Sequence, residues 1–349
     1  MTGIFGAMIC KEALHIVRDR RTMLITLLMP IVLLLLFGFA ISTEVNSVRV
    51  VAVIDMQTDR TRELLGRLSA NEYFSFRGVV SMAETEPMLR RGDADAAVVI
   101  RHDHGVARAQ IIVDASNTPV AKTMTAYLTS VLSGGRGPEM TAHTLFNPQM
   151  RSAYNFVPGI MGMIFILVCA IMTSVSIVSE KESGTMDLLL VSPVRPSTII
   201  FGKLVPYFIL SAVLLAVMLA MAYGVLGIPV SATLTSVAAV SLLYIVLSLS
   251  IGLLVSTLAS TQVSALIISA ILFMLPVILL SGMIFPIDNM PAPLQWLSCA
   301  IPARWYTQAM RTLMIQQSGL AYVATDVAVL AAMTVVTLSA AVLKFKNTR

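Results

Sequence analysis

The most suggestive residue types and spacing lie in one short segment, residues 180–196, between two apolar stretches of the chain. Glu180 and Glu182 stand at its start, and Pro193 ends the pattern. One helical face carries the apolar residues Met186, Leu189 and Leu190. Such a helix suits insertion into a groove on a partner, with the carboxylates as orienting groups. The alternative is an ordinary loop at a membrane surface, and neither interpretation implies covalent chemistry.

The remaining candidates for catalysis, cofactor binding or metal binding do not have the required spacing. The pair Gly202-Lys203 is followed by Leu204 and lacks a glycine five residues upstream of Gly202, unlike a phosphate-binding loop. The segment His102–His104 has no third class of ligand at structural-site spacing, which favours a solvated loop over a metal site. The sequence therefore predicts a protein without catalytic, cofactor or metal residues, and not an enzyme.

Six apolar stretches dominate the chain, each close to the ~20 residues that a helix needs to cross a bilayer. They run over residues 23–42, 156–179, 204–228, 232–257, 263–285 and 320–343. Only Asp326 places a charge within them, near an end. An ion-coupled carrier is expected to keep a carboxylate or histidine at mid-depth, so the energy for any transport should come from elsewhere. The pattern predicts an α-helical polytopic membrane protein with six transmembrane helices.

The charges are distributed unequally about these stretches. The chain is 57% hydrophobic and only 12% charged, whereas about a quarter of residues are charged in soluble proteins. With the N-terminus inside, ten Lys and Arg face five Asp and Glu on that side, against fourteen and fourteen on the other. The net charge of +5 thus follows the positive-inside rule, with both termini cytoplasmic. The excess of basic residues reflects the orientation of the chain in the membrane and gives no reason to expect nucleic acid as a partner.

Two regions outside the apolar stretches predict further structure. Residues 1–22 have the pattern of an amphipathic helix at the cytoplasmic membrane surface, and residues 344–349 form a cytoplasmic tail. Residues 43–155 are long enough to fold as an inserted extracytoplasmic domain. Strands are expected at 48–54, 73–80, 94–100 and 109–113, and helices at 60–68, 82–91 and 119–132. This alternation predicts a small α/β domain.

Small and aromatic residues suggest where helices pack and where the outer surface lies. Stripes with four-residue spacing run through Ala212, Ala216, Ala220 and Gly224, and through Ser248, Gly252, Ser256 and Ser260. Packing within one bundle and a dimer seam or transport pathway are the alternatives for both stripes. The candidates for an external gate or interface are Phe285, Pro286, Trp296, Trp305 and Tyr306. Simple anchoring at the lipid headgroups is the other interpretation of these aromatic residues.

The residues from Glu180 to Tyr207 resemble the signature of type-2 ATP-binding-cassette (ABC) exporter permeases. The run combines an acid-rich start, Gly-Thr, Leu-Leu, Ser-Pro-Val and the final heptad 201–207. Further matches are residues 280–286, Met290-Pro291, Gln295–Ser298, Ile301-Pro302 and Arg311. The resemblance covers essentially the whole chain, and the domain after the first span is similar to that of the larger drug-export branch. The motifs are specific together and weak singly.

The resemblance implies a half-transporter in the bacterial cytoplasmic (inner) membrane, in which two identical or paralogous permeases pair. Each would dock a separate cytoplasmic ATPase that binds ATP and Mg, and the cargo would be hydrophobic or amphipathic, such as a drug or lipid-like molecule. The implied ATPase contacts in a coupling helix at 180–196 are Glu180, Glu182, Gly184, Thr185, Asp187 and Leu189. The N-terminal helix would be a second contact, and residues 286–319 would form an external re-entrant segment. Membrane lipids and a periplasmic adaptor protein are further candidate partners.

A rival interpretation is a non-transporting membrane sensor or assembly protein whose external domain binds a ligand or an envelope partner. No cytoplasmic signalling domain is evident in the sequence, which counts against this interpretation. The segment 180–196 favours the transporter.

Overall fold

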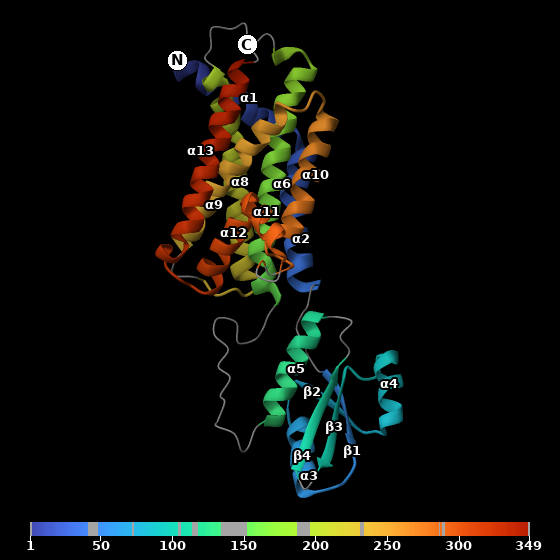
Figure 1. Ribbon diagram of the computed structural model, residues 1–349. Coiled ribbons are helices and arrows are strands. Elements are labelled where there is room, and N and C mark those ends of the chain that lie inside the picture. Colours follow the sequence, from blue (N-terminus) through green and yellow to red (C-terminus); the bar gives the residue numbers. More distant parts are fainter. Residues whose placement is uncertain are drawn as a thin grey trace. The chain divides into compact units, whose positions relative to one another are not determined.

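The computed structural model describes residues 2–40, 48–71, 73–103, 106–113, 118–133, 152–186, 196–230, 234–285, 287 and 290–347. The chain divides into two compact units (Figure 1). The larger unit comprises Met1–Ile41 and Ser152–Arg349, and the smaller one comprises Ser42–Arg151.

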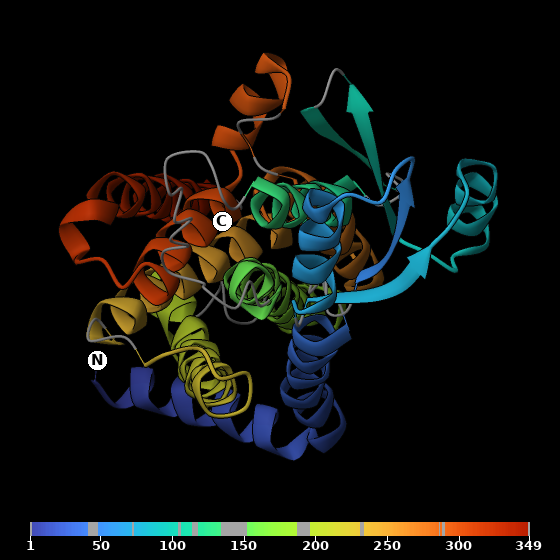
Figure 2. The same cartoon turned by 90° about the horizontal axis from the view of Figure 1, so that it is seen from below.

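Long helices that run side by side build the larger unit, and the first helix, α1, lies across them (Figure 1 and Figure 2). The helices that run side by side are α2 (Arg20–Ala40), α6 (Ser152–Glu182), α8 (Pro196–Gly224), α9 (Leu234–Ser256), α10 (Gln262–Leu280) and α13 (Ala324–Asn347), and the helix across them is α1 (Thr2–Arg18). Between α10 and α13 lie α11 (Ala292–Cys299), α12 (Pro302–Met310), the π-helix η2 (Arg311–Ile315) and the 3-10 helix η3 (Leu320–Val323). A proline occupies the first turn of both α11 and α12, where a missing N–H group leaves no hydrogen bond unmade.

Five helices in the described part of the chain are long and apolar enough to cross a membrane. They are Phe156–Glu182, Thr198–Gly224, Leu234–Ser256, Gln262–Leu280 and Leu320–Lys344. In α2 the apolar part is shorter, Thr26–Phe37. The stretch predicted to end at Phe285 extends beyond the helix, because α10 ends at Leu280 and Gly282 follows with a φ of 78°, outside helical geometry.

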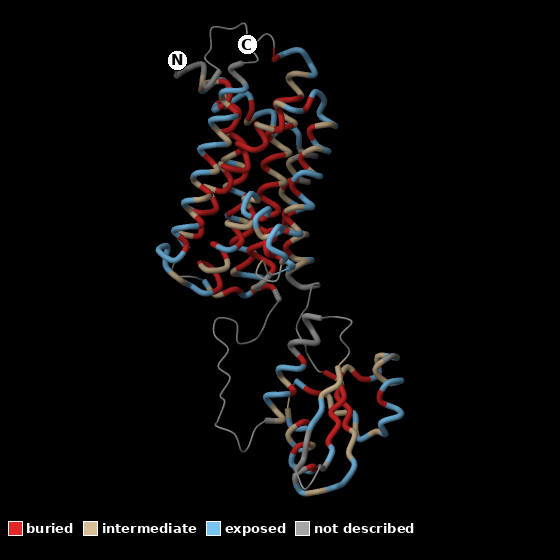
Figure 3. Tube along the Cα trace, in the orientation of Figure 1, coloured by how far each residue is buried: buried red, intermediate tan, exposed pale blue. Residues whose placement is uncertain are grey.

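Helix α6 lies at the centre of the larger unit, in contact with α2, α8, α9, α10 and α12. In its apolar segment 67% of the residues are buried, against 17% in α10 and 22% in α13. Buried positions accordingly concentrate on the inward sides of the helices (Figure 3). Because a helix that is apolar all round must face either a protein core or lipid, α6 forms the packed core, and α10 and α13 present apolar surface outward.

A four-stranded sheet in the order β2-β1-β3-β4 forms the centre of the smaller unit. Its elements are β1 (Val48–Ile54), α3 (Asp59–Ser69), β2 (Phe74–Val79), α4 (Met82–Arg91), β3 (Ala96–Asp103), β4 (Val106–Val113) and α5 (Thr118–Ser133). Strand β1 pairs in parallel with β2 and β3, and β3 pairs antiparallel with β4. Helices α3 and α4 make the crossover connections that parallel strands require.

Hydrophobic side chains are buried on both faces of this sheet. On one face Val50 and Val98 pack with side chains of α3 and α5, and on the other Val51 and Ala97 pack with side chains of α4. Strand β4 begins at Val106, earlier than the predicted residue 109, because its whole length pairs with β3.

Candidate functional site

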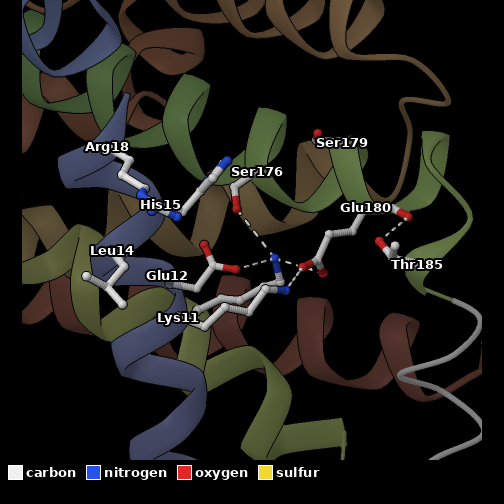
Figure 4. Close-up of a pocket in the computed structure, with 10 residues that line it drawn as sticks. Lys11, Glu12, Leu14, His15, Arg18, Ser176, Ser179, Glu180 and Thr185 are labelled. Atoms are coloured by element: carbon white, nitrogen blue, oxygen red, sulfur yellow. Dashed lines mark hydrogen bonds and ion pairs between the residues drawn. The ribbon is translucent and has the colours of Figure 1, made fainter. Parts of the chain in front are cut away.

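Charged side chains join three helices at one end of α6. Lys203 Nζ on α8 lies 3.0 Å from Glu12 Oε1 on α1 and 2.9 Å from Glu180 Oε2 on α6. Lys11 Nζ on α1 lies 2.8 Å from the other oxygen of Glu180. Figure 4 shows Lys11, Glu12 and Glu180 converging at this point. We call Lys11, Glu12, Glu180 and Lys203 the ion cluster.

The ion cluster is largely shielded from solvent. The side chains of Lys203, Glu12 and Glu180 are 4%, 5% and 12% exposed, whereas that of Lys11 is 63% exposed. Burying an ion costs several kcal/mol unless a counter-ion lies beside it, and here two cations balance two carboxylates. Hydrogen bonding to Glu180 raises the pKa of Lys11, so Lys11 stays charged at neutral pH. Loss of any buried member would leave an opposite charge uncompensated.

A glycine allows α1 to approach α8 closely enough to form the cluster. A Cβ atom on Gly202 would lie 3.2 Å from Met8 Cβ, which is tighter than an ordinary contact. Met8 and Glu12 are one turn apart on the same face of α1, so this close approach also brings Glu12 beside Lys203. The pair Gly202-Lys203 therefore supplies a packing site and a buried cation.

Three consecutive residues bind the end of α6 to neighbouring helices. Glu180 belongs to the ion cluster, and Lys181 Nζ donates a hydrogen bond to the Ser256 carbonyl at the end of α9. Glu182 Oε2 accepts hydrogen bonds from the backbone N–H and the side-chain Nε2 of Gln262, both at 3.1 Å. Gln262 begins α10, where N–H groups lack helical partners and a carboxylate is favoured by the helix dipole. Movement of this last turn is thus coupled to α1, α8, α9 and α10.

The chain turns sharply directly after α6. Gly184 has a φ of 72°, the left-handed conformation that glycine adopts readily at helix ends. Thr185 Oγ1 donates to the Glu180 carbonyl at 3.2 Å and so satisfies one of the last carbonyl groups of the helix. Thr185 and Met186 after this turn are helical, and residues 187–195 lie outside the described residues.

The prediction that a separate helix begins at residue 180 is therefore wrong. Glu180 and Glu182 form the last turn of α6, because their carboxylates find partners on neighbouring helices and the backbone continues its helical hydrogen bonds. Ser183 and Gly184 form the turn that follows, and Thr185 and Met186 are helical again. Two further predicted contacts, Asp187 and Leu189, lie outside the described residues.

A family model described as ABC-2 family transporter protein matches residues 20–343. The chain belongs to this family. It is 26% identical over 330 residues to the probable multidrug ABC transporter permease YbhS of Escherichia coli strain K12, which covers 88% of each chain. It is 29% identical over an aligned length of 359 residues to the probable multidrug ABC transporter permease YbhR of the same strain, which covers 97% of each chain. The similarity to the inner membrane transport permease YhhJ of that strain is 25% over 257 residues, or 68% of this chain and 67% of YhhJ.

These similarities make the chain the permease subunit of an ABC-2 type transporter. In this permease the two small-residue stripes have different surroundings. The buried stripe of α9 consists of Ser248, Gly252 and Ser256. A Cβ atom on Gly252 would lie 2.7 Å from the Ala170 carbonyl oxygen, so this stripe packs against α6 of the same chain. Ala216 and Ala220 of α8 are exposed instead, which leaves their stripe accessible to lipid or to a second copy.

Tyr306 of the permease does not lie at an outer surface. Its side chain is fully buried, and its ring stacks on Tyr244 of α9 with the two ring centroids 4.2 Å apart. Its hydroxyl lies 3.0 Å from Ser241 Oγ, within hydrogen-bond distance. The expectation that Tyr306 belongs to an interfacial belt is therefore wrong, because both its ring and its hydroxyl have partners in the core.

The other gate candidates lie closer to solvent or lipid. Phe285 and Trp296 are 54% and 80% exposed. Trp305 Nε1 donates a hydrogen bond to the Cys299 carbonyl at 2.9 Å, which joins α12 to the end of α11. Pro286 lies outside the described residues. Phe285 and Trp296 are thus exposed where Tyr306 is buried.

Sequence reasoning missed Lys11, Glu12 and Lys203 as site residues. One signal was available: Lys203 borders an apolar stretch, and a cation at such a position needs a counter-ion. The counter-ion could not be chosen, because Glu12 lies 191 residues away in the sequence. In the residues described by the structure, no group of three or more His, Cys, Asp or Glu side chains could hold a metal ion.

Proposed function

We propose that this permease is one half of an exporter that moves a hydrophobic or amphipathic compound, such as a drug or lipid-like molecule, outward. The energy comes from ATP hydrolysis, with Mg, in a separate cytoplasmic ATPase subunit. The ion cluster is the observation that carries this proposal. It fastens α1 and α8 to the last turn of α6, and the chain leaves that turn directly into residues 183–195. A force that a partner applies to residues 183–195 therefore reaches the central helix of the bundle.

The ATPase docks on this end of the helical unit, with α1 as a second contact surface. Its contacts in the turn and the segment after α6 are Glu182, Gly184, Thr185, Asp187 and Leu189. Glu180 contributes differently, because its carboxylate binds two lysines within the chain and so fixes the position of the docking segment. The apolar face expected around Leu189 supplies the hydrophobic anchor that a helix in a groove requires.

In this proposal α2 is the first of six spans, both termini are cytoplasmic, and the sheet-containing unit is extracytoplasmic, in a bacterial inner membrane. The excess of Lys and Arg on the side of the termini supports this orientation. The similarity to YhhJ, which is named an inner membrane transport permease, supports the location. The residues between α10 and α13 form a re-entrant external segment, which suits the short helices α11 and α12.

A hydrophobic cargo agrees with the apolar character of the spans, because a polar cargo needs polar groups to replace its lost hydration. The multidrug names of YbhS and YbhR support a drug-like compound. A second permease, identical or paralogous, completes the pathway, and the exposed Ala216 and Ala220 offer a surface for close helix packing. Membrane lipids and a periplasmic adaptor complete the expected partners.

Reconstitution tests the proposal. The permease is co-expressed with the ATPase encoded by a neighbouring reading frame, and the complex is reconstituted in proteoliposomes. A lipophilic dye is supplied on the side of the membrane that carries the ATPase. We expect dye movement that requires ATP and Mg and disappears when the catalytic glutamate of the ATPase is replaced. Dye movement that is equal with and without ATP would contradict the proposal.

A further inference from the structure

Two adjoining cavities lie beside the ion cluster and share His15, Ser176 and Ser179 in their walls. The first has a volume of about 420 Å³ and lies among the polar side chains shown in Figure 4. The second, of about 520 Å³, is lined by the junction of α1 and α2, by α6, by Tyr207 of α8 and by the start of α10. We call the two together the amphipathic cleft. Each volume is within the range of about 300–1,000 Å³ that is typical of ligand pockets.

The walls of the amphipathic cleft change from polar to apolar along its length. The first cavity is lined by charged and hydroxyl groups from α1, α6 and α8. The apolar walls of the second cavity come from Ile16, Met23, Ile171, Met172, Val175 and Leu266. A ligand that satisfies both parts must itself have a polar head and an apolar chain, because buried polar and apolar groups each need matching surroundings.

The charges in the walls favour an anionic head. The charges of the ion cluster cancel within the cluster, and Asp19, the remaining carboxylate in the walls, has a partner of its own. Arg18 lines the first cavity and pairs with none of the carboxylates that the structure describes. His15 lies beside it on α1, and Ser176 and Ser179 add hydroxyl groups. Among the residues that the structure describes here, Arg18 is thus an available cation at the polar end.

The position of the cleft also matches that of a lipid head group. It lies where the spans α6 and α10 meet the surface helix α1, at the level where an amphipathic helix contacts head groups. Basic residues at this level attract anionic lipids of the cytoplasmic leaflet.

We infer that the amphipathic cleft binds an anionic amphiphile from the inner leaflet. The head group lies at Arg18 and His15, and the chain lies along α6 between α2 and α10. This inference rests on the orientation given in the proposed function, and it gives the cargo a charged head and an entry site. A neutral lipophilic compound would occupy only the second cavity.

A photoactivatable phosphatidylglycerol with a diazirine on its acyl chain tests the inference. The full-length permease is purified, placed in phosphatidylcholine nanodiscs with the probe at half-saturation, illuminated and mapped by mass spectrometry. We expect labelling within Ile171–Val175, displaced by unlabelled phosphatidylglycerol and not by phosphatidylcholine. Arg18→Gln should weaken probe binding about five-fold, since one basic residue near the surface contributes about 1 kcal/mol.

Matched variants distinguish binding in the amphipathic cleft from general effects of a substitution on labelling. Leu266→Trp should fill the apolar part and abolish labelling of Ile171–Val175, whereas Leu279→Trp, at an equally exposed position farther along α10, should not. Arg62→Gln removes a cation from α3 of the smaller unit and should leave labelling unchanged. Equal labelling in wild type, Arg18→Gln and Leu266→Trp would overturn the inference, as would equal displacement by both unlabelled lipids.

The same preparations distinguish this inference from the proposed function. Normal cleft labelling in a complex that never exports dye would refute the exporter and leave the binding site supported. Normal ATP-driven dye export, together with labelling that is unchanged in Arg18→Gln and in Leu266→Trp, would refute the cleft alone.

Discussion

Lys203 and Glu12 are 191 residues apart in the sequence, yet Lys203 Nζ lies 3.0 Å from Glu12 Oε1 with both side chains almost fully buried. A buried ion pair rarely stabilises a protein more than well-packed apolar side chains would. Its effect is to favour the observed arrangement, because a placement of α1 that moves Glu12 away from Lys203 would leave the Glu12 carboxylate buried without that cation. The position of the surface helix is therefore specified by charge as well as by the contact between Met8 and Gly202.

Removal of one buried partner should be far more harmful than removal of the exposed one. We expect Lys203→Met to cost about 3–5 kcal/mol, because Glu12 and Glu180 would then share the single cation Lys11. Lys11→Met should cost less than about 1 kcal/mol, because its side chain is 63% exposed. Thermal unfolding of the detergent-purified permease measures both, and Glu12→Leu combined with Lys203→Met should recover most of the loss. Equal melting temperatures for the two single variants would show that the ion cluster does not organise this region.

The turn after α6 should matter for association with the ATPase more than for stability. Gly184 has a positive φ, which proline cannot adopt, so Gly184→Pro should distort the turn and displace residues 185–195. Leu189→Asp should charge the expected apolar face and have the same effect. Co-purification with the ATPase at equal membrane abundance is the measurement. Gly227→Pro imposes the same strain at the end of α8 and should leave association intact. Normal association of both docking variants would rule out this contact.

Gly252 should tolerate no side chain. A Cβ atom there would lie 2.7 Å from the Ala170 carbonyl oxygen and 2.9 Å from Thr173 Cβ, so Gly252→Leu must push α9 away from α6. We expect a loss of about 1–3 kcal/mol in stability together with impaired export, while ATPase association persists because the change is distant from residues 183–195. Gly224→Ala is the control, since its added Cβ atom meets nothing within 4 Å. A Gly252→Leu protein with normal melting and normal dye export would contradict the packing shown by the structure.

The smaller unit should become less stable in acid through Asp95. Burial alone raises the pKa of Asp95, but hydrogen bonds and the charge of Arg49 outweigh it and lower the pKa below the ordinary value. The stabilisation is therefore fully present above the unfolded pKa of about 4 and is lost as the pH falls through the lowered pKa. Hydrogen exchange of β1 and β3 in the full-length protein, corrected for intrinsic rates, should accelerate over that range. Asp95→Asn should already exchange faster at neutral pH and lose this acid dependence; an unchanged acid response in Asp95→Asn would assign the effect to another group.

The sequence by itself determined five helices that are long and apolar enough to cross a membrane, and the order of strands and helices in the smaller unit. These features depend on the local composition and periodicity of continuous segments, so Leu234–Ser256 is recognisable as a span without any knowledge of its neighbours. The family likewise follows from motifs that are local in the sequence, such as residues 180–207. The ends of helices were predicted less accurately. Helix α10 ends within an apolar run, because Gly282 has a positive φ.

Only the tertiary structure decided which side chains meet. Glu180 and Glu182 look in sequence like the acidic start of a helix, but Lys203 and Gln262 bind their carboxylates and extend α6 through them. Tyr306 looks like an interfacial aromatic residue, but Tyr244 of another helix stacks on it in the core. Such pairings depend on how whole helices pack, and no local pattern encodes them, because residues far apart in the chain can meet only after the bundle has assembled.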